Sequence, residues 1–316
     1  MTQNGTVVRL SGVRKTFGVH TAVDDFDLAI EPGTIYGLLG PNGSGKTTTI
    51  RMMMGILLPD GGSVELFGGA PDFARRSRVG YLPEERGVYE KMKVLDQLVF
   101  FGEIRGVARP LARTRAEEWL ERLALSEWAS KKVQALSKGM QQKVQFISTV
   151  LHDPELLILD EPFSGLDPIN QDVLEEIVLE EKERGKTILF STHLMEQAER
   201  LCERVCLISR SRKVLDDDLK ELKRRERTGV VAVEFEGEAP SVATWPDVSE
   251  VEEAGDALHL TLRDGVPTDE LLAKVAAEGA SLRRFELLEP RLHEIFVRHA
   301  GEPAEDDASS RTGGVS

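Results

Sequence analysis

Short apolar runs alternate with segments of helical spacing along the first two thirds of the chain. The runs have the length of strands buried on both faces of a parallel sheet, and they lie at residues 35–39, 156–159 and 187–193. Between and after them, apolar residues recur three and four positions apart, which predicts helices at 48–54, 111–125 and 168–184. Alternation of this kind predicts an α/β fold with a parallel sheet.

Two parts of this region depart from the alternation. Shorter strands are predicted at 6–10, 22–30 and 63–67. From residue 85 to about residue 150 the spacing is almost entirely helical. We expect this span to form a helical subdomain inserted into the α/β core.

The pattern changes again beyond residue 215. Residues 215–228 are densely charged and predict a solvated helix or linker. Strands are then predicted at 230–235, 258–262 and 281–288, and helices at 268–278 and from 292 onward. The expected domains are therefore 1–222, a small α+β domain at 223–301, and an acidic, Ser- and Gly-rich disordered tail at 302–316.

Composition narrows the range of partners. The chain of 316 residues carries a net charge of −14, which argues against broad binding to nucleic acid and against electrostatic anchoring to anionic lipid. The N-terminal residues lack a secretory signal pattern, and no apolar stretch has the length of a membrane span, so a cytoplasmic location is expected. Any association with a membrane would then depend on a partner protein. The two cysteines, Cys202 and Cys206, are expected to be buried and reduced.

The most informative stretch is G-P-N-G-S-G-K-T at residues 40–47, which lies between the strand at 35–39 and the helix at 48–54. It matches G-x-x-x-x-G-K-[ST], in which glycines let backbone N–H groups turn towards phosphate oxygens at a helix N-terminus. Lys46 is then expected to reach the β- and γ-phosphates, and Thr47 to place its hydroxyl on Mg²⁺. A glycine-rich turn without a ligand is the alternative, but the flanking strand and helix favour a nucleotide site.

Two carboxylates follow the apolar strand at 156–159, where ligands bind in open α/β sheets. Such pairs are usually solvated loop charges. Beside a phosphate loop, Asp160 gains a role on Mg²⁺, and Glu161 could polarise an attacking water. His193 ends the next buried strand and could contact a γ-phosphate, although a lone histidine there is structural as often as not.

An aromatic residue lies upstream of the phosphate loop. Phe17 could stack on the base of a nucleotide, whereas a phenylalanine between two strands is more often part of the core. The residue itself does not decide between these two roles.

Together, these motifs resemble the ATP-binding-cassette (ABC) ATPases over roughly residues 5–225. The segment L-S-K-G-M at 136–140 is similar to the family's signature loop, usually L-S-G-G-Q, with Ser137 and Gly139 retained. The resemblance implies a P-loop NTPase core of the ABC type, with an antiparallel β subdomain and the helical subdomain described above. It also implies that ATP lies between two subunits, with Ser137 and Gly139 touching the γ-phosphate of the nucleotide held by the opposite copy.

The resemblance also implies roles for single residues. It places Phe17 under the adenine, His193 at the switch histidine, and Asp167 in the loop that couples the two sites. The nucleotide-binding set that it implies further comprises Asn42, Gly43, Ser44, Gly45, Lys46, Thr47 and Thr48. Catalysis is expected from Glu161, His193 and Lys46.

One position departs from the family pattern. Glu84 stands where the family normally has a glutamine, so the contacts that the family's glutamine makes are not assigned to Glu84. A carboxylate can still bind Mg²⁺, and the expected metal ligands are Thr47, Glu84 and Asp160. With the loop at 136–140, Glu84 makes the chain resemble export-type cassettes of the sodium-efflux and drug-resistance kind.

The resemblance implies an ATPase that pairs with a second copy of itself, or with a paralogous cassette, and drives a separate membrane permease. The chain would lie in the cytoplasm, on the inner face of the membrane through that permease, contacting it in the helical region at 84–101. The alternative is a soluble ABC ATPase acting on nucleic acid or ribosomes. Such relatives carry a long insertion between phosphate loop and signature, or two cassettes in one chain, and this sequence has neither. A nucleotide kinase or GTPase would have no use for the signature loop.

Overall fold

The structure is a computed structural model that describes residues 5–85, 87–237, 240–263, 265–278 and 280–300. The chain forms two compact units that divide between Asp218 and Leu219, rather than between 222 and 223 as the sequence suggested. The charged helix α8 (Leu219–Arg225) belongs to the second unit. The residue that follows it, Glu226, binds Arg298 and His299 near the end of the chain. The expected tail at 302–316 lies outside the described residues.

A six-stranded sheet forms the centre of the first unit. Its strands lie in the order β5 (Val79–Leu82), β6 (Leu156–Asp160), β7 (Thr187–Thr192), β3 (Ile35–Leu39), β8 (Arg204–Ser209), β9 (Arg212–Asp218). The first five are parallel and β9 pairs antiparallel with β8. Every residue of β3, β6 and β7 is buried, which explains their continuous apolar runs. The helices that connect these strands are α1 (Lys46–Met53), α6 (Pro168–Glu183) and α7 (Met195–Leu201).

An antiparallel sheet packs on α1 and is formed by β1 (Val8–Phe17), β2 (His20–Ile30) and β4 (Gly61–Leu66), followed by the short helix α2 (Phe73–Arg76). The first two strands are longer than the sequence predicted, since they continue until Phe17 pairs with His20. Register shifts after Leu10 interrupt the alternation of apolar and polar residues, so the pattern seemed to end there. One apolar core joins this sheet, α1 and the central sheet, and it includes Phe26, Met53 and Ile158.

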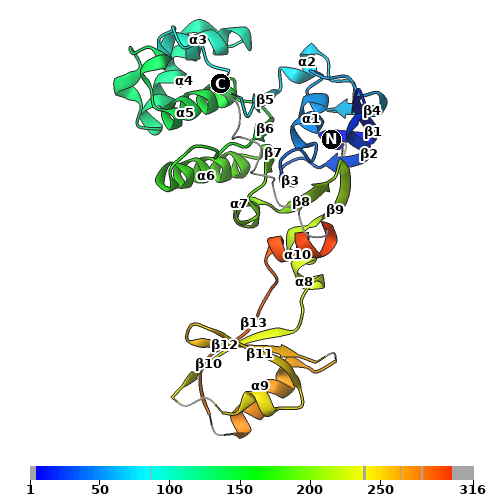
Figure 1. The fold of residues 1–316 in the computed structure, drawn as a ribbon. Coiled ribbons are helices and arrows are strands. Elements are labelled where there is room, and N and C mark those ends of the chain that lie inside the picture. Colours follow the sequence, from blue (N-terminus) through cyan, green and yellow to red (C-terminus); the bar gives the residue numbers. More distant parts are fainter. Residues whose placement is uncertain (1–4, 86, 238–239, 264, 279, 301–316) are drawn as a thin grey trace, which may run out of the picture. The chain divides into compact units, whose positions relative to one another are not determined.

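Residues 85–150 contain three helices and two short 3₁₀ turns. The elements are α3 (Val94–Ile104), α4 (Arg109–Arg122), η1 (Ser126–Trp128), η2 (Val133–Ala135) and α5 (Lys138–Val150). The three helices lie together in Figure 1. Trp119 of α4 meets Phe146 of α5 edge-on, with ring centroids 6.1 Å apart, and Leu120 is buried beside them. The cysteines lie elsewhere, at the end of α7 and in β8 rather than on one helix, and both are buried free thiols.

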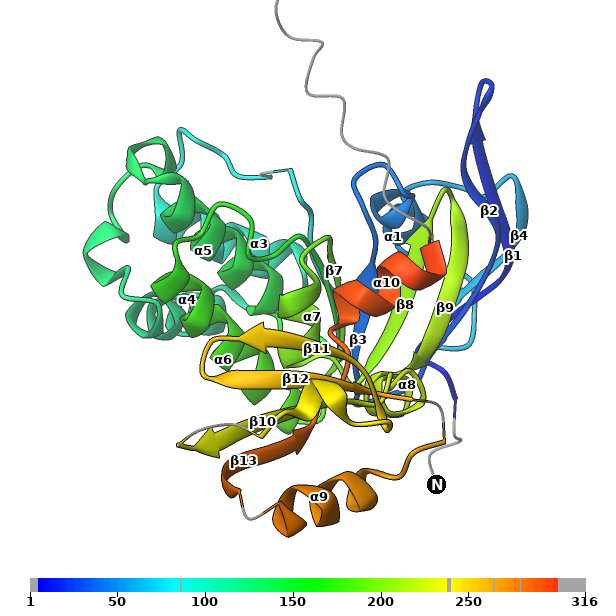
Figure 2. The same cartoon turned by 60° about the horizontal axis from the view of Figure 1, so that its bottom comes forward.

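The second unit contains an antiparallel sheet of four strands with one helix against it (Figure 2). The sheet order is β11 (Val248–Ala254), β12 (Ala257–Leu262), β10 (Val230–Glu236), β13 (Ser281–Leu287). Helix α9 (Thr268–Ala277) contributes Leu271 and Val275 to the core, and η3 (Val242–Thr244) and α10 (Leu292–Ala300) complete the unit. Strand β11 was not expected, because its glutamates are exposed on an edge strand and weaken the strand pattern. Within the described residues, no helix has the length and apolar character needed to cross a bilayer.

Candidate nucleotide-binding and hydrolysis site

The phosphate loop connects the buried strand β3 to the first turn of α1. Three of its glycines have positive φ, namely Gly40 (155°), Gly43 (76°) and Gly45 (111°). Two of them are also held in close contact with the chain. A Cβ on Gly40 would lie 2.2 Å from the carbonyl oxygen of Ile208, and one on Gly45 would lie 2.3 Å from that of Ala22. The loop therefore needs glycine for its conformation and for the packing of β8 and β2 against it.

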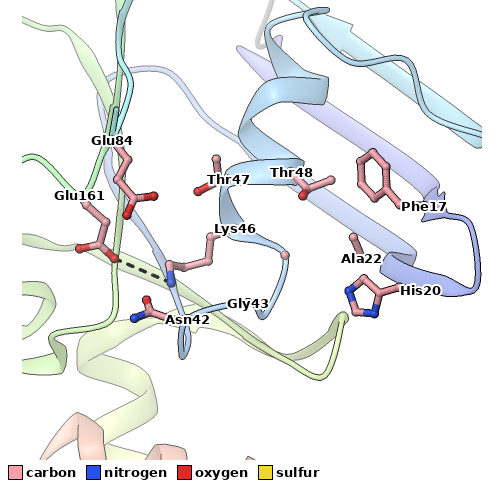
Figure 3. A pocket seen from close by; sticks show the side chains of 11 residues that line it. Phe17, His20, Ala22, Asn42, Gly43, Lys46, Thr47, Thr48, Glu84 and Glu161 are labelled. Carbon is pink, nitrogen blue, oxygen red and sulfur yellow. Dashed lines mark ion pairs between the residues drawn. The ribbon is translucent and has the colours of Figure 1, made fainter. Parts of the chain in front are cut away.

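Beside this loop is a cavity of about 400 Å³, which is in the range of small-molecule binding sites. Residues from four separate parts of the chain meet there (Figure 3). Its lining consists of Phe17, His20, Ala22, Asn42, Gly43, Gly45, Lys46, Thr47, Thr48, Glu84 and Glu161.

Lys46 provides the cationic centre of the cavity. Its side chain is 6% exposed, and Nζ donates a hydrogen bond of 2.8 Å to the carbonyl oxygen of Gly40. Nζ lies 3.8 Å from Oε1 of Glu161 (Figure 3). Burial lowers the pKa of Lys46, and the charges of Glu161, Asp160 and Glu84 oppose that shift. The amine is thus a desolvated cation held among three carboxylates.

The two carboxylates at the end of β6 have different environments. Asp160 is fully buried and accepts a hydrogen bond from the hydroxyl of Ser191 on β7. Burial raises the pKa of Asp160, against the lowering effect of the Ser191 and Thr47 hydroxyls. Its second oxygen, Oδ2, has no hydrogen-bond partner among the described residues, and the same is true of Oγ of Ser44 in the loop. An unpaired buried oxygen next to the phosphate loop fits a bound cation that is held with the nucleotide.

Glu161 leaves the strand with a φ of +49°, a left-handed conformation that costs a non-glycine residue about 1 kcal/mol. The turn directs its carboxylate into the cavity, where Oε1 lies 2.9 Å from Nδ1 of His193. His193 follows β7 and is itself outside the cavity lining. Strands β6 and β7 carry Glu161 and His193, and α1 begins with Lys46, so the imidazole and the amine both lie near Oε1 of Glu161.

Phe17 lies at the far end of the cavity from Glu161 (Figure 3). The residue is 49% exposed, and the ammonium group of Lys15 lies 5.6 Å from the ring centroid. Because a half-exposed ring lines the cavity, the fold does not use Phe17 as a core residue.

Residues 23–164 match the family model described as ABC transporter. Residues 218–300 match the model of the DrrA1-3-like ATP-binding protein C-terminal domain. The chain is 43% identical over 295 residues to the uncharacterized ABC transporter ATP-binding protein YhaQ of Bacillus subtilis (strain 168), and the alignment covers 93% of this chain and 99% of that protein. The chain belongs to the ATP-binding subunits of ABC transporters. As a member of this family it binds ATP and is an ATPase.

Two further comparisons agree with this assignment. The Nod factor export ATP-binding protein I of Ralstonia nicotianae is 35% identical over 307 residues, covering 95% of each chain. A solved structure titled as the ATP binding subunit of an ABC transporter superposes with a TM-score of 0.65 at 29% identity, over 70% of this chain and 93% of that one. The P-loop fold of the ABC type that the sequence indicated is thereby confirmed.

In this ABC subunit, the sequence-predicted residues fall into three groups. Phe17, Glu84, Glu161 and most of the phosphate loop line the cavity, and Asp160, Ser44 and His193 lie directly beside it. Ser137 and Gly139 do not line the cavity of their own chain. Ser137 caps the N-terminus of α5, with Oγ accepting from the backbone N–H of Met140 at 3.3 Å. Ser137 is exposed and Gly139 is half-buried. Asp167 likewise caps α6, accepting from the backbone N–H of Asn170 at 3.1 Å.

Sequence reasoning missed His20, Ala22 and Ser191. The two-residue turn at Gly18 and Val19 was the available signal for the first two, because a hairpin that closes there places His20 opposite Phe17. Ser191 precedes Thr192 and His193 on a buried strand, and nothing in its local sequence distinguishes it from a core residue.

Proposed function

We propose that two copies of this chain, or this chain and a paralogous cassette, close on two molecules of ATP with Mg²⁺ and drive a separate membrane permease by hydrolysis. The observation that carries this proposal is the arrangement around Glu161 Oε1, which lies 2.9 Å from His193 Nδ1 and 3.8 Å from Lys46 Nζ. The base of the nucleotide would stack on Phe17. The phosphates would lie along the phosphate loop, from Asn42 and Gly43 to Thr48.

The donors beside the loop fit Mg²⁺. We propose Thr47, Asp160 and Glu84 as the residues that hold it, directly or through water, and the unpaired Oδ2 of Asp160 supports this set. Oxygen donors of this kind are what Mg²⁺ prefers. When bound, Mg²⁺ would neutralise negative charge on the transferred phosphate.

Glu161 is proposed as the general base that orients the attacking water and accepts its proton. Its strained backbone points the carboxylate into the cavity, and the bond with His193 fixes its orientation. Lys46 Nζ would leave the Gly40 carbonyl for the phosphate oxygens and stabilise the charge that develops on them. Hydrolysis then depends on groups that are already held in place.

Ser137 and Gly139 are proposed to complete the site of the opposite copy. They lie at the start of α5, a helix of 13 residues, where backbone N–H groups and the helix dipole favour an anion. A Cβ placed on Gly139 would meet Leu166 Cδ2 at 3.5 Å and the carbonyl oxygen of Gly165 at 3.8 Å, which are ordinary contact distances, so packing against these residues does not require a glycine here.

The permease is proposed to dock on the helical region near residues 84–101. Tyr89, Phe100 and Phe101 form an aromatic cluster with ring centroids 5.8–5.9 Å apart, and Tyr89 is 52% exposed. An exposed aromatic cluster is typical of a protein interface. Beside it is a second cavity of about 220 Å³ that includes Phe101, Gln145 and His152 in its lining.

Gln145 connects that docking surface to the nucleotide cavity. Its Nε2 donates to the carbonyl oxygens of Pro83 and Glu85, on either side of Glu84. Its Oε1 and the Nδ1 of His152 are buried without a partner among the described residues, so both are acceptors for a docked segment. Burial lowers the pKa of His152 to about 4, which keeps the imidazole neutral at physiological pH. A permease segment bound in this cavity would contact Gln145, whose hydrogen bonds hold the loop that carries Glu84.

Export is the favoured direction, because relatives that align over nearly the whole chain are named for Nod factor export and the second unit matches a DrrA-type domain. Through the permease, the chain would lie on the cytoplasmic face of the membrane. Action on nucleic acid or ribosomes is not favoured by the net charge of −14 or by the names of the relatives.

The test of this proposal is the Glu161→Gln variant of the full chain with ATP and Mg²⁺. We expect ATP to convert it to a stable dimer in light scattering after gel filtration, because binding is retained and hydrolysis is blocked. Adding Ser137→Ala should weaken that dimer, whereas Glu196→Gln alone should behave as the native chain. A monomer under all conditions would contradict ATP-driven pairing. Purification from solubilised membranes should yield a polytopic membrane protein in stoichiometric amount, and ribosomal proteins in its place would contradict the transport role.

A further inference from the structure

The imidazole of His20 lines the nucleotide cavity without belonging to any sequence motif. His20 and Phe17 are directly opposite each other where β1 and β2 meet, so their side chains leave the same face of the hairpin. The turn between them has only two residues, and Gly18 supplies the positive φ of 58° that such a turn needs. The hairpin thus presents two rings to the cavity rather than one.

The hairpin is fixed relative to the phosphate loop. The carbonyl oxygen of Ala22 abuts Gly45, leaving no space for a Cβ there. Two hydrogen bonds with Ser211 hold the same strand from the other side, one from its hydroxyl to the carbonyl of Thr21 at 2.7 Å and one from the N–H of Asp24 to its carbonyl at 2.9 Å. His20 therefore has a defined position next to the loop.

Phe17 and His20 lie together at one end of the cavity. Figure 3 shows them there with Ala22, and it shows Gly43 and Thr48 between this end and Lys46. If the base stacks on Phe17 and the phosphates lie on the loop, the ribose is the group between them. His20 lies beside Phe17 on the same face of the hairpin, so the sugar attached to a stacked base is the part of the nucleotide left for it to contact.

The chemistry of the ring suits a sugar hydroxyl. An imidazole offers one donor and one acceptor when neutral and two donors when charged, and a hydroxyl can match either form. Across the described part of the chain, no group forms a hydrogen bond or ion pair with the His20 ring. Both ring nitrogens are therefore available to a ligand.

We propose that His20 hydrogen-bonds a ribose hydroxyl of the bound nucleotide and thereby selects nucleotides that carry this hydroxyl over those that lack it. The inference rests on the proposed nucleotide site, and it adds a specificity-determining residue to it. The phosphate loop and Phe17 bind the phosphates and base that both classes share, so neither can provide this selection.

The test is the affinity of the full chain for ATP, 2′-deoxy-ATP and 3′-deoxy-ATP, measured by competition with a fluorescent nucleotide. His20→Ala should weaken ATP binding by about fivefold, the size of one exposed hydrogen bond. It should not further weaken the analogue that lacks the contacted hydroxyl, because that analogue has already lost the bond. His20→Gln should restore part of the affinity for ATP. Val19→Ala, in the same turn but outside the cavity lining, should change nothing.

Two results would overturn the inference. An equal loss for all three nucleotides would show that His20 only supports the hairpin, and an unchanged affinity for ATP would show that no contact exists. If this cavity were not the nucleotide site, the result would differ, because Lys46→Ala would then leave the affinity for ATP unaltered. If Lys46→Ala abolishes ATP binding while His20→Ala has no effect, the nucleotide site is supported and the proposed ribose contact is refuted.

Discussion

The two ends of the nucleotide cavity are built in different ways. At the phosphate end, Lys46 and Glu161 are nearly buried, and each is positioned by a backbone conformation that is tightly constrained. At the other end, which is proposed to hold the base, Phe17 and His20 are exposed side chains of a hairpin, and their placement follows from the pairing of β1 with β2. The end proposed for catalysis thus consists of buried groups that cannot move without cost, whereas the end proposed for recognition consists of surface side chains. Substitutions should therefore act on turnover at one end and on affinity at the other.

The largest effect is expected for Glu161→Gln at the phosphate end. Removing a general base lowers kcat by roughly a thousandfold, while the KM for ATP should change little because the amide has the same shape. Steady-state ATPase assays measure both constants. Glu196→Gln, in the first turn of α7 and outside the cavity lining, provides the control. A variant that retains more than a tenth of the native kcat would remove Glu161 from the mechanism.

Asp160→Asn should have the next largest effect, about a hundredfold on kcat at fixed Mg²⁺ concentration. The amide retains a partner for Ser191 but loses the charge that a divalent cation needs. Raising the Mg²⁺ concentration should recover part of the activity, and a titration of activity against Mg²⁺ checks this. If the native chain and the Asp160→Asn variant show the same Mg²⁺ dependence, Asp160 does not hold the metal.

Gly45→Ala tests the junction between the two ends. The new Cβ would meet the carbonyl of Ala22 at 2.3 Å with a φ of +111°, so we expect roughly 2 kcal/mol of lost stability or a comparable loss of ATP affinity. Gly43→Ala is the matched control, since its φ is also positive but its Cβ would meet no atom within 4 Å. Thermal unfolding and nucleotide titration of both variants give the comparison. Equal effects of the two substitutions would mean that close packing against β2 does not position the loop.

The smallest of these four effects is expected for Phe17→Ala at the base end. Loss of stacking should raise the KM for ATP about tenfold and leave kcat nearly unchanged. Phe17→Tyr should bind as the native chain does, because the ring is retained. A fall in kcat without a change in KM would contradict the division of roles between the two ends.

Local sequence predicted the phosphate end because each of its parts is a short motif with its own physics. A buried parallel strand must be apolar along its whole length, and the glycines that follow β3 are required by positive φ within the loop itself. The carboxylates at the end of β6 could be placed as well, because parallel strands end at one edge of a sheet. Two features of the cavity escaped this reasoning. The strands β1 and β2 extend through register shifts that hide their alternation, and Ser191 reaches Asp160 from a strand adjacent in space but 31 residues away in sequence.

By itself, the sequence determined the α/β class, the phosphate loop, the carboxylate pair and the presence of a separate α+β unit, since each depends on residues that are close along the chain. Only the tertiary structure decided that Phe17 lines a cavity rather than a core, that His20 accompanies it, and that His193 and Lys46 share one oxygen of Glu161. Those relations arise from strand pairing and from the order of strands in a sheet, which bring distant residues together. Hydrophobic periodicity reports which face of an element is buried, and it carries no information about which element lies on the other side.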